Sequence, residues 1–370
     1  MRLFEEFIDN EDFASIPRRK RALRERALAF AGELGYWRQR NRADHALGSD
    51  VQRCMMSLER DALRRSESGR LAWAHYLSPG SVLSGLHAKI VEAGDGRCVF
   101  ILSEGSGSGP AAAILSGYVA GIFDYHVANG AGQTTDAAIV ALIEKTNDLI
   151  EQKSFAGRFV SILVGIADSN KETITLVTAG SNFPFLWRAG QDSAEVLRLT
   201  DAPAAGSFPT EMIASRSNGF ITSTFQFLQG DVFIAASDGL SSSRKIATDD
   251  DQSEVQEFGG KQIRPILRAV MRRERMALDL GLPGARKLEL DFSSATDPVT
   301  DVLLALASVE TVFRENVYSL PADPAVASFL SRMCPFLAAP QEPVQPEQRL
   351  PEPPRDRAKY ATVAIQAVRR

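Results

Sequence analysis

The chain has 370 residues, of which 44% are hydrophobic and 24% charged, and this composition is typical of a globular protein with a substantial core. The formal net charge of -4 argues against a dedicated nucleic-acid-binding protein, which is usually basic. No apolar run approaches the roughly 20 residues of a membrane-spanning helix, and the acidic N-terminal stretch lacks the pattern of a signal peptide. The three cysteines are too scattered for a disulfide framework, so we expect a cytoplasmic protein without membrane contact.

Residues 1–70 are rich in charged and helix-forming residues and predict a helical linker or regulatory segment. Four apolar residues share one helix face: Val51, Met55, Leu58 and Ala62. This face either packs on the chain's own domain or forms a dimer interface, so a homodimer through residues 1–70 is one expectation. The basic run at residues 18–21 is expected to be a solvent-facing helix surface.

Residues 71–310 alternate short apolar runs with helical patterns. Strands are expected at 97–102, 159–166, 173–178 and 231–236, and helices at 111–127 and 135–151. Thr135 is a candidate N-cap of the second helix, whose expected buried face comprises Ile139, Leu142, Ile143, Leu149 and Ile150. The turn-prone residues 168–170 predict an antiparallel hairpin. This order favours an α+β sandwich over a parallel βαβ repeat.

The C-terminal part, from residue 311 onward, differs in composition from the main domain. Residues 311–334 predict a helical extension of the main domain. Seven prolines between residues 335 and 354 predict an extended linker over 335–358, followed by a strand within 359–370. That strand must dock either on this domain or on a partner.

Seven short segments then follow one another in a recognisable order. They are residues 73–79, 84–89, 104–109, 158–162, 179–184, 236–240 and 257–259. The last six of them stand where a known family has GGDxxD, DVSGHG, MFVT, AGHNPP, TDGL and E-FG. Over about residues 50–310 the chain therefore resembles the SpoIIE-like, RsbU-type branch of the metal-dependent (PPM) serine/threonine protein phosphatases.

The resemblance implies a PPM phosphatase-like α-β-β-α sandwich with an N-terminal helical segment. In this family, aspartates at the edges of the sandwich hold two Mn²⁺ or Mg²⁺ ions, which are hard cations that prefer oxygen ligands. The metal pair activates a water molecule for attack on phosphorus. Carboxylate charge at these positions is therefore essential to catalysis.

The implied metal positions depart from the family pattern. Leu86 and Lys89 replace the two aspartates of the first motif, and the ammonium of Lys89 would repel a cation in that pocket. Glu104 replaces the next aspartate and Asp238 is retained, while Ser108 replaces the motif's histidine. The implied metal positions are Glu104, Gly105, Asp238, Asp297 and Asp301. The implied motif-turn residues are Gly107, Ser108, Gly109 and Gly239.

The last ligand position has two alternatives. In one, the final strand is 301–309 and offers Asp297 or Asp301. In the other it is 361–368, where Lys359 and Tyr360 precede Ala361-Thr362 and bring neither acid of the family's DDxT strand, so that Glu104 and Asp238 are the remaining acids. Either way, the carboxylates fall below the complement that two metals need.

The resemblance therefore favours a degenerate phosphatase-fold regulator with no assigned catalytic residue and no cofactor. Its implied partners are a phosphoprotein, a STAS-type protein, a serine kinase or a sensor. The alternative is an active serine/threonine phosphatase that uses Mn²⁺ or Mg²⁺. Phosphate binding by the glycine-rich residues 105–109 and serine hydrolase chemistry are weaker alternatives, because the P-loop lysine and the GxSxG elbow are absent from the sequence. His87 is interpreted as a packing residue.

Overall fold

The computed structural model describes most of the chain from residue 64 onward and scattered residues between 30 and 52. The described ranges are 64–66, 69–79, 83–94, 96–129, 135–153, 157–181, 184–249, 252–280, 287–315, 323–334 and 359–368. The chain divides into two compact units, Met1–Asp50 and Val51–Arg370, and the described residues of the first unit are helical. The basic run 18–21 and the predicted apolar face at Met55, Leu58 and Ala62 lie outside the described residues.

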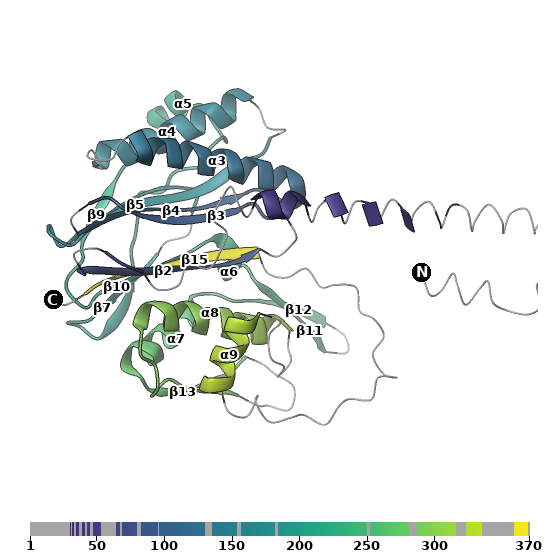
Figure 1. The fold of residues 1–370 in the computed structure, drawn as a ribbon, viewed down its shortest axis with the longest axis vertical. Coiled ribbons are helices and arrows are strands. Elements are labelled where there is room, and N and C mark those ends of the chain that lie inside the picture. The colour runs from purple at the N-terminus through teal and green to yellow at the C-terminus, as the bar shows by residue number, and fades with distance from the viewer. Residues whose placement is uncertain are drawn as a thin grey trace, which may run out of the picture. The chain divides into compact units, whose positions relative to one another are not determined.

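Two antiparallel sheets form the centre of the second unit (Figure 1). The six-stranded sheet has the order β1 (Arg64–Arg65), β2 (Leu71–Pro79), β15 (Lys359–Ala367), β10 (Val232–Ala236), β7 (Phe185–Arg188) and β8 (Ser193–Val196). The five-stranded sheet has the order β3 (Leu86–Glu92), β4 (Arg97–Gly105), β5 (Val160–Asp168), β6 (Thr173–Ala179) and β9 (Ser223–Gln226). Every neighbouring pair is antiparallel.

Helices cover the outer face of each sheet, as Figure 1 shows. The five-stranded sheet is covered by α3 (Gly109–Asn129), α4 (Asp136–Lys153) and α5 (Thr210–Ser217). The six-stranded sheet is covered by α7 (Gly260–Arg272), α8 (Pro298–Glu315) and α9 (Pro324–Met333). A short helix and two ribbons complete the unit: α6 (Asp238–Ser241), β11 (Arg244–Asp249) with β12 (Gln252–Glu257), and β13 (Arg275–Leu278) with β14 (Leu288–Asp291). The predicted α-β-β-α sandwich is confirmed.

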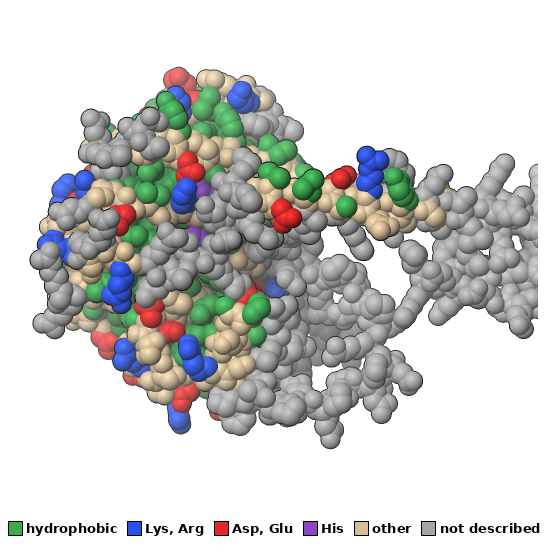
Figure 2. All heavy atoms as spheres, viewed as in Figure 1, with side chains coloured by type: hydrophobic (Ala, Val, Ile, Leu, Met, Phe, Trp, Pro, Cys, Tyr) green, Lys and Arg blue, Asp and Glu red, His purple; other side chains and the backbone are tan. Residues whose placement is uncertain are grey.

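Three apolar layers hold the sandwich together. The layer between the sheets includes Leu86, Phe100, Phe233 and Val363, and one further layer lies between each sheet and its helices. Gly165 of β5 is needed because a Cβ at this position would overlap the ring of Phe100. On the face shown in Figure 2, acidic and basic side chains are interspersed among apolar ones.

Most predicted elements are present with small shifts of their ends. Thr135 caps α4 by accepting a hydrogen bond from the Ala138 amide at 3.2 Å, and the predicted hairpin forms with Asp168 opposite Thr173. The final strand is β15, and the alternative strand at 301–309 is wrong because these residues lie within α8. Among the described residues, no helix has both the length and the apolar character needed to cross a bilayer.

Candidate functional site

The two sheets meet through Glu104 and the turn that contains Asp238. Glu104 lies near the end of β4, whereas Asp238 begins α6 directly after β10 of the other sheet. The Gly239 amide donates a hydrogen bond to Glu104 Oε2 at 3.3 Å. The structure therefore brings together the two motif segments that the sequence placed at the metal site.

The Asp238 turn is fixed by hydrogen bonds to β15 and to its own helix. Ser237 donates its amide to the Ala361 carbonyl at 2.8 Å and accepts the Ala361 amide on Oγ at 3.1 Å. The Asp238 carbonyl accepts the amide and the hydroxyl of Ser242 at 2.9 and 2.8 Å. The position of the Asp238 carboxylate thus depends on the strand that ends the described chain.

Leu86 lies directly opposite Glu104 on the neighbouring strand. Residues that face one another across an antiparallel pair point to the same side of the sheet. Leu86 is fully buried in the apolar layer between the sheets. The position beside Glu104 is therefore filled by a hydrocarbon side chain instead of a second carboxylate.

Lys89 lies on the other side of β3, because side chains alternate along a strand. Its ammonium forms an ion pair with Asp124 of α3 at 2.6 Å. The expectation that Lys89 places a cation in the metal pocket is wrong: its charge is directed to the helix layer.

The glycine-rich segment after β4 is a tight turn into α3. The Gly105 amide donates to the Gly85 carbonyl at 2.8 Å, and Ser106 exchanges hydrogen bonds with Phe159. Gly107 and Gly109 have φ values of 82° and 72°, a region that favours glycine, and Ser108 is exposed.

Arg158 covers this turn. Its Nη1 donates to the Ser106 carbonyl at 2.8 Å, and the same atom fills the space that a Cβ at Gly107 would need. In the sequence, Arg158 belongs to a strand motif for which no role of the arginine was predicted. The positive φ of Gly107 favours glycine there, and the Arg158 guanidinium lies over the position.

The other candidate acids lie at the start of α8. Asp301 accepts the amides of Thr296 and Asp297 at 2.9 and 3.0 Å, and its carboxylate is 3.5 Å from Arg332 of α9. Asp297 accepts the amide of Thr300 at 3.2 Å. Burial raises the pKa of Asp301, while these amides and Arg332 oppose that rise. The structure gives both carboxylates the role of organising the helix N-terminus.

The segment that the resemblance matches to the family's last acidic pair lies at the start of β15. Tyr360 lies opposite Ser78 and Thr362 opposite Ala236, so this end of the strand runs beside the Asp238 turn. The residues here are Lys359 and Tyr360 in place of aspartates.

The donor set does not fit a pair of divalent cations. Mn²⁺ and Mg²⁺ take about six oxygen ligands each, with carboxylates to balance the charge. Within the described part of the chain, no three His, Cys, Asp or Glu side chains are grouped so that they could hold a metal. Glu104 and Asp238 are the acids that the motif positions leave at this junction, which we call the Glu104–Asp238 junction.

Comparisons with known proteins agree with this fold. Residues 94–276 match the family model described as Stage II sporulation protein E (SpoIIE). The SiaA-PP2C domain of Pseudomonas aeruginosa has a TM-score of 0.54 at 11% identity, covering 90% of this chain and 98% of that chain. A search of curated proteins found no match.

Two further solved structures have lower scores. The RsbU and RsbW domains of a Mycobacterium tuberculosis protein give a TM-score of 0.48 at 14% identity, with 80% of this chain covering 60% of that one. The PP2C phosphatase domain of Bacillus subtilis SpoIIE, with a fragment of its regulatory domain, gives 0.47 at 12% identity, with 83% and 70% covered. Residues 94–276 are therefore similar to the SpoIIE family, and the α-β-β-α sandwich is the fold of the PPM phosphatases.

Proposed function

We propose that this SpoIIE-type domain regulates a serine/threonine phosphorylation switch by binding a protein partner, without hydrolysing a phosphoester itself. The observation that carries the proposal is the Leu86–Glu104 pair, in which a buried leucine lies where a metal-binding carboxylate is expected. A binuclear metal site cannot form without negative charge from several converging side chains.

The Glu104–Gly239 hydrogen bond supports the same proposal. A carboxylate that accepts a backbone amide forms a charge-assisted hydrogen bond. Here it joins the ends of β4 and α6, and thus links the two sheets directly at 3.3 Å. The Glu104 carboxylate is thus engaged by a protein group at the junction.

The partner follows from the resemblance to RsbU-type regulators. We propose a phosphoprotein of the STAS type, its serine kinase or a sensor as the protein bound, with residues 1–70 as the segment that dimerises or receives a signal. We propose that the protein acts in the cytoplasm, without nucleic acid or a membrane as a ligand.

Hydrolysis of p-nitrophenyl phosphate and of a phosphoserine peptide, with Mn²⁺ titrated from zero to millimolar concentration, tests the proposal. We expect no rate above that of the protein-free buffer at any Mn²⁺ concentration, and calorimetry with Mn²⁺ alone should give no saturable heat.

Asp238→Ala is the informative variant, and Asp201→Asn is its control because Asp201 is an exposed carboxylate that is not one of the motif acids. A Mn²⁺-dependent rate that survives in Asp201→Asn and disappears in Asp238→Ala would show an active phosphatase and overturn the proposal.

A further inference from the structure

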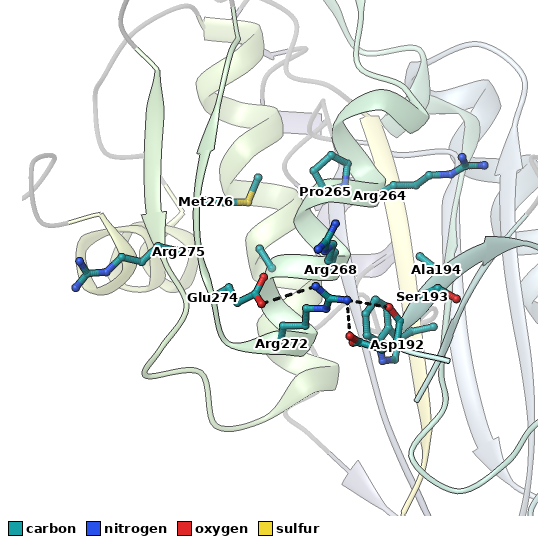
Figure 3. Close-up of a pocket in the computed structure, with 12 residues that line it drawn as sticks. Asp192, Ser193, Ala194, Arg264, Pro265, Arg268, Arg272, Glu274, Arg275 and Met276 are labelled. Carbon is teal, nitrogen blue, oxygen red and sulfur yellow. Dashed lines mark hydrogen bonds and ion pairs between the residues drawn. The ribbon is translucent and has the colours of Figure 1, made fainter. Parts of the chain in front are cut away.

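An arginine-lined groove lies on the helix layer outside the six-stranded sheet (Figure 3). It has a volume of about 500 Å³ and is bounded by α7, by the β7–β8 hairpin and by the start of β13. Four arginines line it: Arg264, Arg268, Arg272 and Arg275. No role was predicted for this segment from the sequence, although arginine recurs at every fourth residue of 264–272.

Two of these arginines already have carboxylate partners. Arg272 is paired with Asp192 and lies 3.8 Å from Glu274, which Figure 3 shows on either side of it. Arg275 binds Asp291 at 2.7 Å. Neither of them has its full charge available for a ligand.

Arg264 and Arg268 differ from that pair. Both are exposed, and no hydrogen bond or ion pair is found for either within the part of the chain that the structure describes. They lie one helical turn apart on α7, so their side chains leave the same face of the helix. The groove thus presents two neighbouring guanidinium groups that can each bind a carboxylate in bidentate fashion.

The spacing of the two arginines matches an extended acidic chain. Four residues of α-helix rise about 6 Å, because each residue adds about 1.5 Å. Alternate residues of an extended strand are about 6.6 Å apart and point to the same side. A peptide that runs along α7 would therefore place acidic side chains at alternate positions near Arg264 and Arg268.

The groove also contains an edge strand. β8 is the last strand of its sheet as the structure describes it, and Ser193 and Ala194 line the groove. The Leu197 amide bonds to the Pro184 carbonyl at 2.9 Å, so by the alternation of an antiparallel ladder Glu195 directs its backbone groups to β7. The backbone groups of Ala194 then face the edge, where an added strand could bind them.

We propose that the groove between α7 and β8 binds an extended segment of a protein partner that has acidic residues at alternate positions. Backbone groups of the segment pair with the edge of β8, and its carboxylates bind Arg264 and Arg268. Trp187 is buried at the base of the groove and gives it a rigid floor. The inference rests on this groove and does not depend on whether the domain hydrolyses phosphoesters.

Fluorescence anisotropy with the full chain and a labelled peptide of about eight alternating Glu and Thr residues tests the proposal. Arg264→Ala with Arg268→Ala should weaken binding about tenfold, because each exposed charge pair contributes modestly. Both changes place a good helix former at an exposed position, so the unfolding midpoint should stay unchanged.

The matched control is Lys261→Ala with Arg198→Ala, which removes the same charge from two exposed residues outside the groove lining. This control should bind the peptide as the unchanged chain does. Equal weakening in both double variants would reveal only a general effect of net charge and would overturn the proposal.

Two altered peptides test the mode of binding. A peptide with the same acids gathered at one end, and one with N-methylated backbone amides, should both bind more weakly than the alternating peptide. Equal binding of either peptide would overturn the extended-strand geometry. Tighter binding of ATP or of a single-stranded oligonucleotide, lost in the Arg264/Arg268 variant, would show that the groove serves another class of ligand.

Discussion

At the scale of single residues, His87 shows how position on a strand decides the chemistry of a side chain. It follows Leu86 on β3 and therefore points to the helix layer, where it is 1% exposed and its ring makes an edge contact with Phe123 at 6.2 Å. Burial, followed by the charges of Lys89 and His75, lowers the pKa of His87 to about 3. The imidazole is thus a neutral core group, as the sequence analysis interpreted it.

This lowered pKa predicts a loss of stability in mild acid. Below pH 6.5 the unfolded chain binds a proton at His87, while the folded chain stays neutral until about pH 3. The free energy of unfolding should therefore decrease as the pH is lowered, by about 2 kcal/mol from pH 7 to pH 5 from this residue alone. Urea unfolding at both pH values should show a smaller fall in His87→Leu than in the unchanged chain.

His126→Gln is the control, because His126 lies in the last turn of α3 and is only half-buried, whereas His87 is buried. Its difference between the two pH values should match that of the unchanged chain. An identical fall in His87→Leu would show that His87 is not the group responsible.

At the scale of elements, an amphipathic pattern identifies a helix directly, whereas a wholly apolar run is compatible with a helix or a strand. The α4 pattern is legible because polar residues separate its buried positions Ile139, Leu142 and Ile143. In α8, nearly every residue from 301 to 310 is buried, so its apolar run has no polar face. Such a pattern is equally compatible with a buried strand. Asp301 was therefore a candidate ligand by sequence, whereas the fold makes it part of a helix start.

The role of Asp301 predicts a structural cost on its removal. Asp301→Ala would leave the amides of Thr296 and Asp297 without their acceptor and Arg332 without its carboxylate. Loss of buried hydrogen bonds of this kind costs about 1–3 kcal/mol. Thermal or urea unfolding in metal-free buffer should show this loss, with the exposed Asp201→Ala unchanged.

Unfolding of the same variant in the presence of Mn²⁺ can contradict the helix-start role of Asp301. If millimolar Mn²⁺ stabilised the unchanged chain and this stabilisation vanished in Asp301→Ala, then Asp301 would be a metal ligand and its assignment to the helix start would be incomplete.

At the scale of the whole molecule, the chain closes its larger sheet with its C-terminal strand. β15 lies between β2 and β10, and Ala361, Val363 and Ile365 are fully buried in the layer between the sheets. The sequence predicts this strand from its apolar run, but a long proline-rich segment separates it from α9, and no local pattern can tell where a tethered strand docks. The same long-range pairing places Tyr360 at the junction. The acids missing from the implied metal positions could therefore be counted only after the structure had shown which of the two candidate strands belongs to the sheet.

This position predicts that the C-terminal strand is required for folding. A chain truncated after Cys334 would expose the facing edges of β2 and β10 and remove their shared partner. Such a chain should lose the cooperative unfolding transition that the full chain shows when circular dichroism is followed in urea.

The milder change Ile365→Ala should keep the transition and lower the free energy of unfolding by about 2–5 kcal/mol, because it removes a fully buried side chain. Deleting residues 341–350, within the predicted linker, is the matched control, since the remaining residues still span tens of ångströms when extended. A cooperative transition of unchanged midpoint after truncation would mean that the sheet is complete without β15, and that the Asp238 turn is held in place by contacts other than those with Ala361.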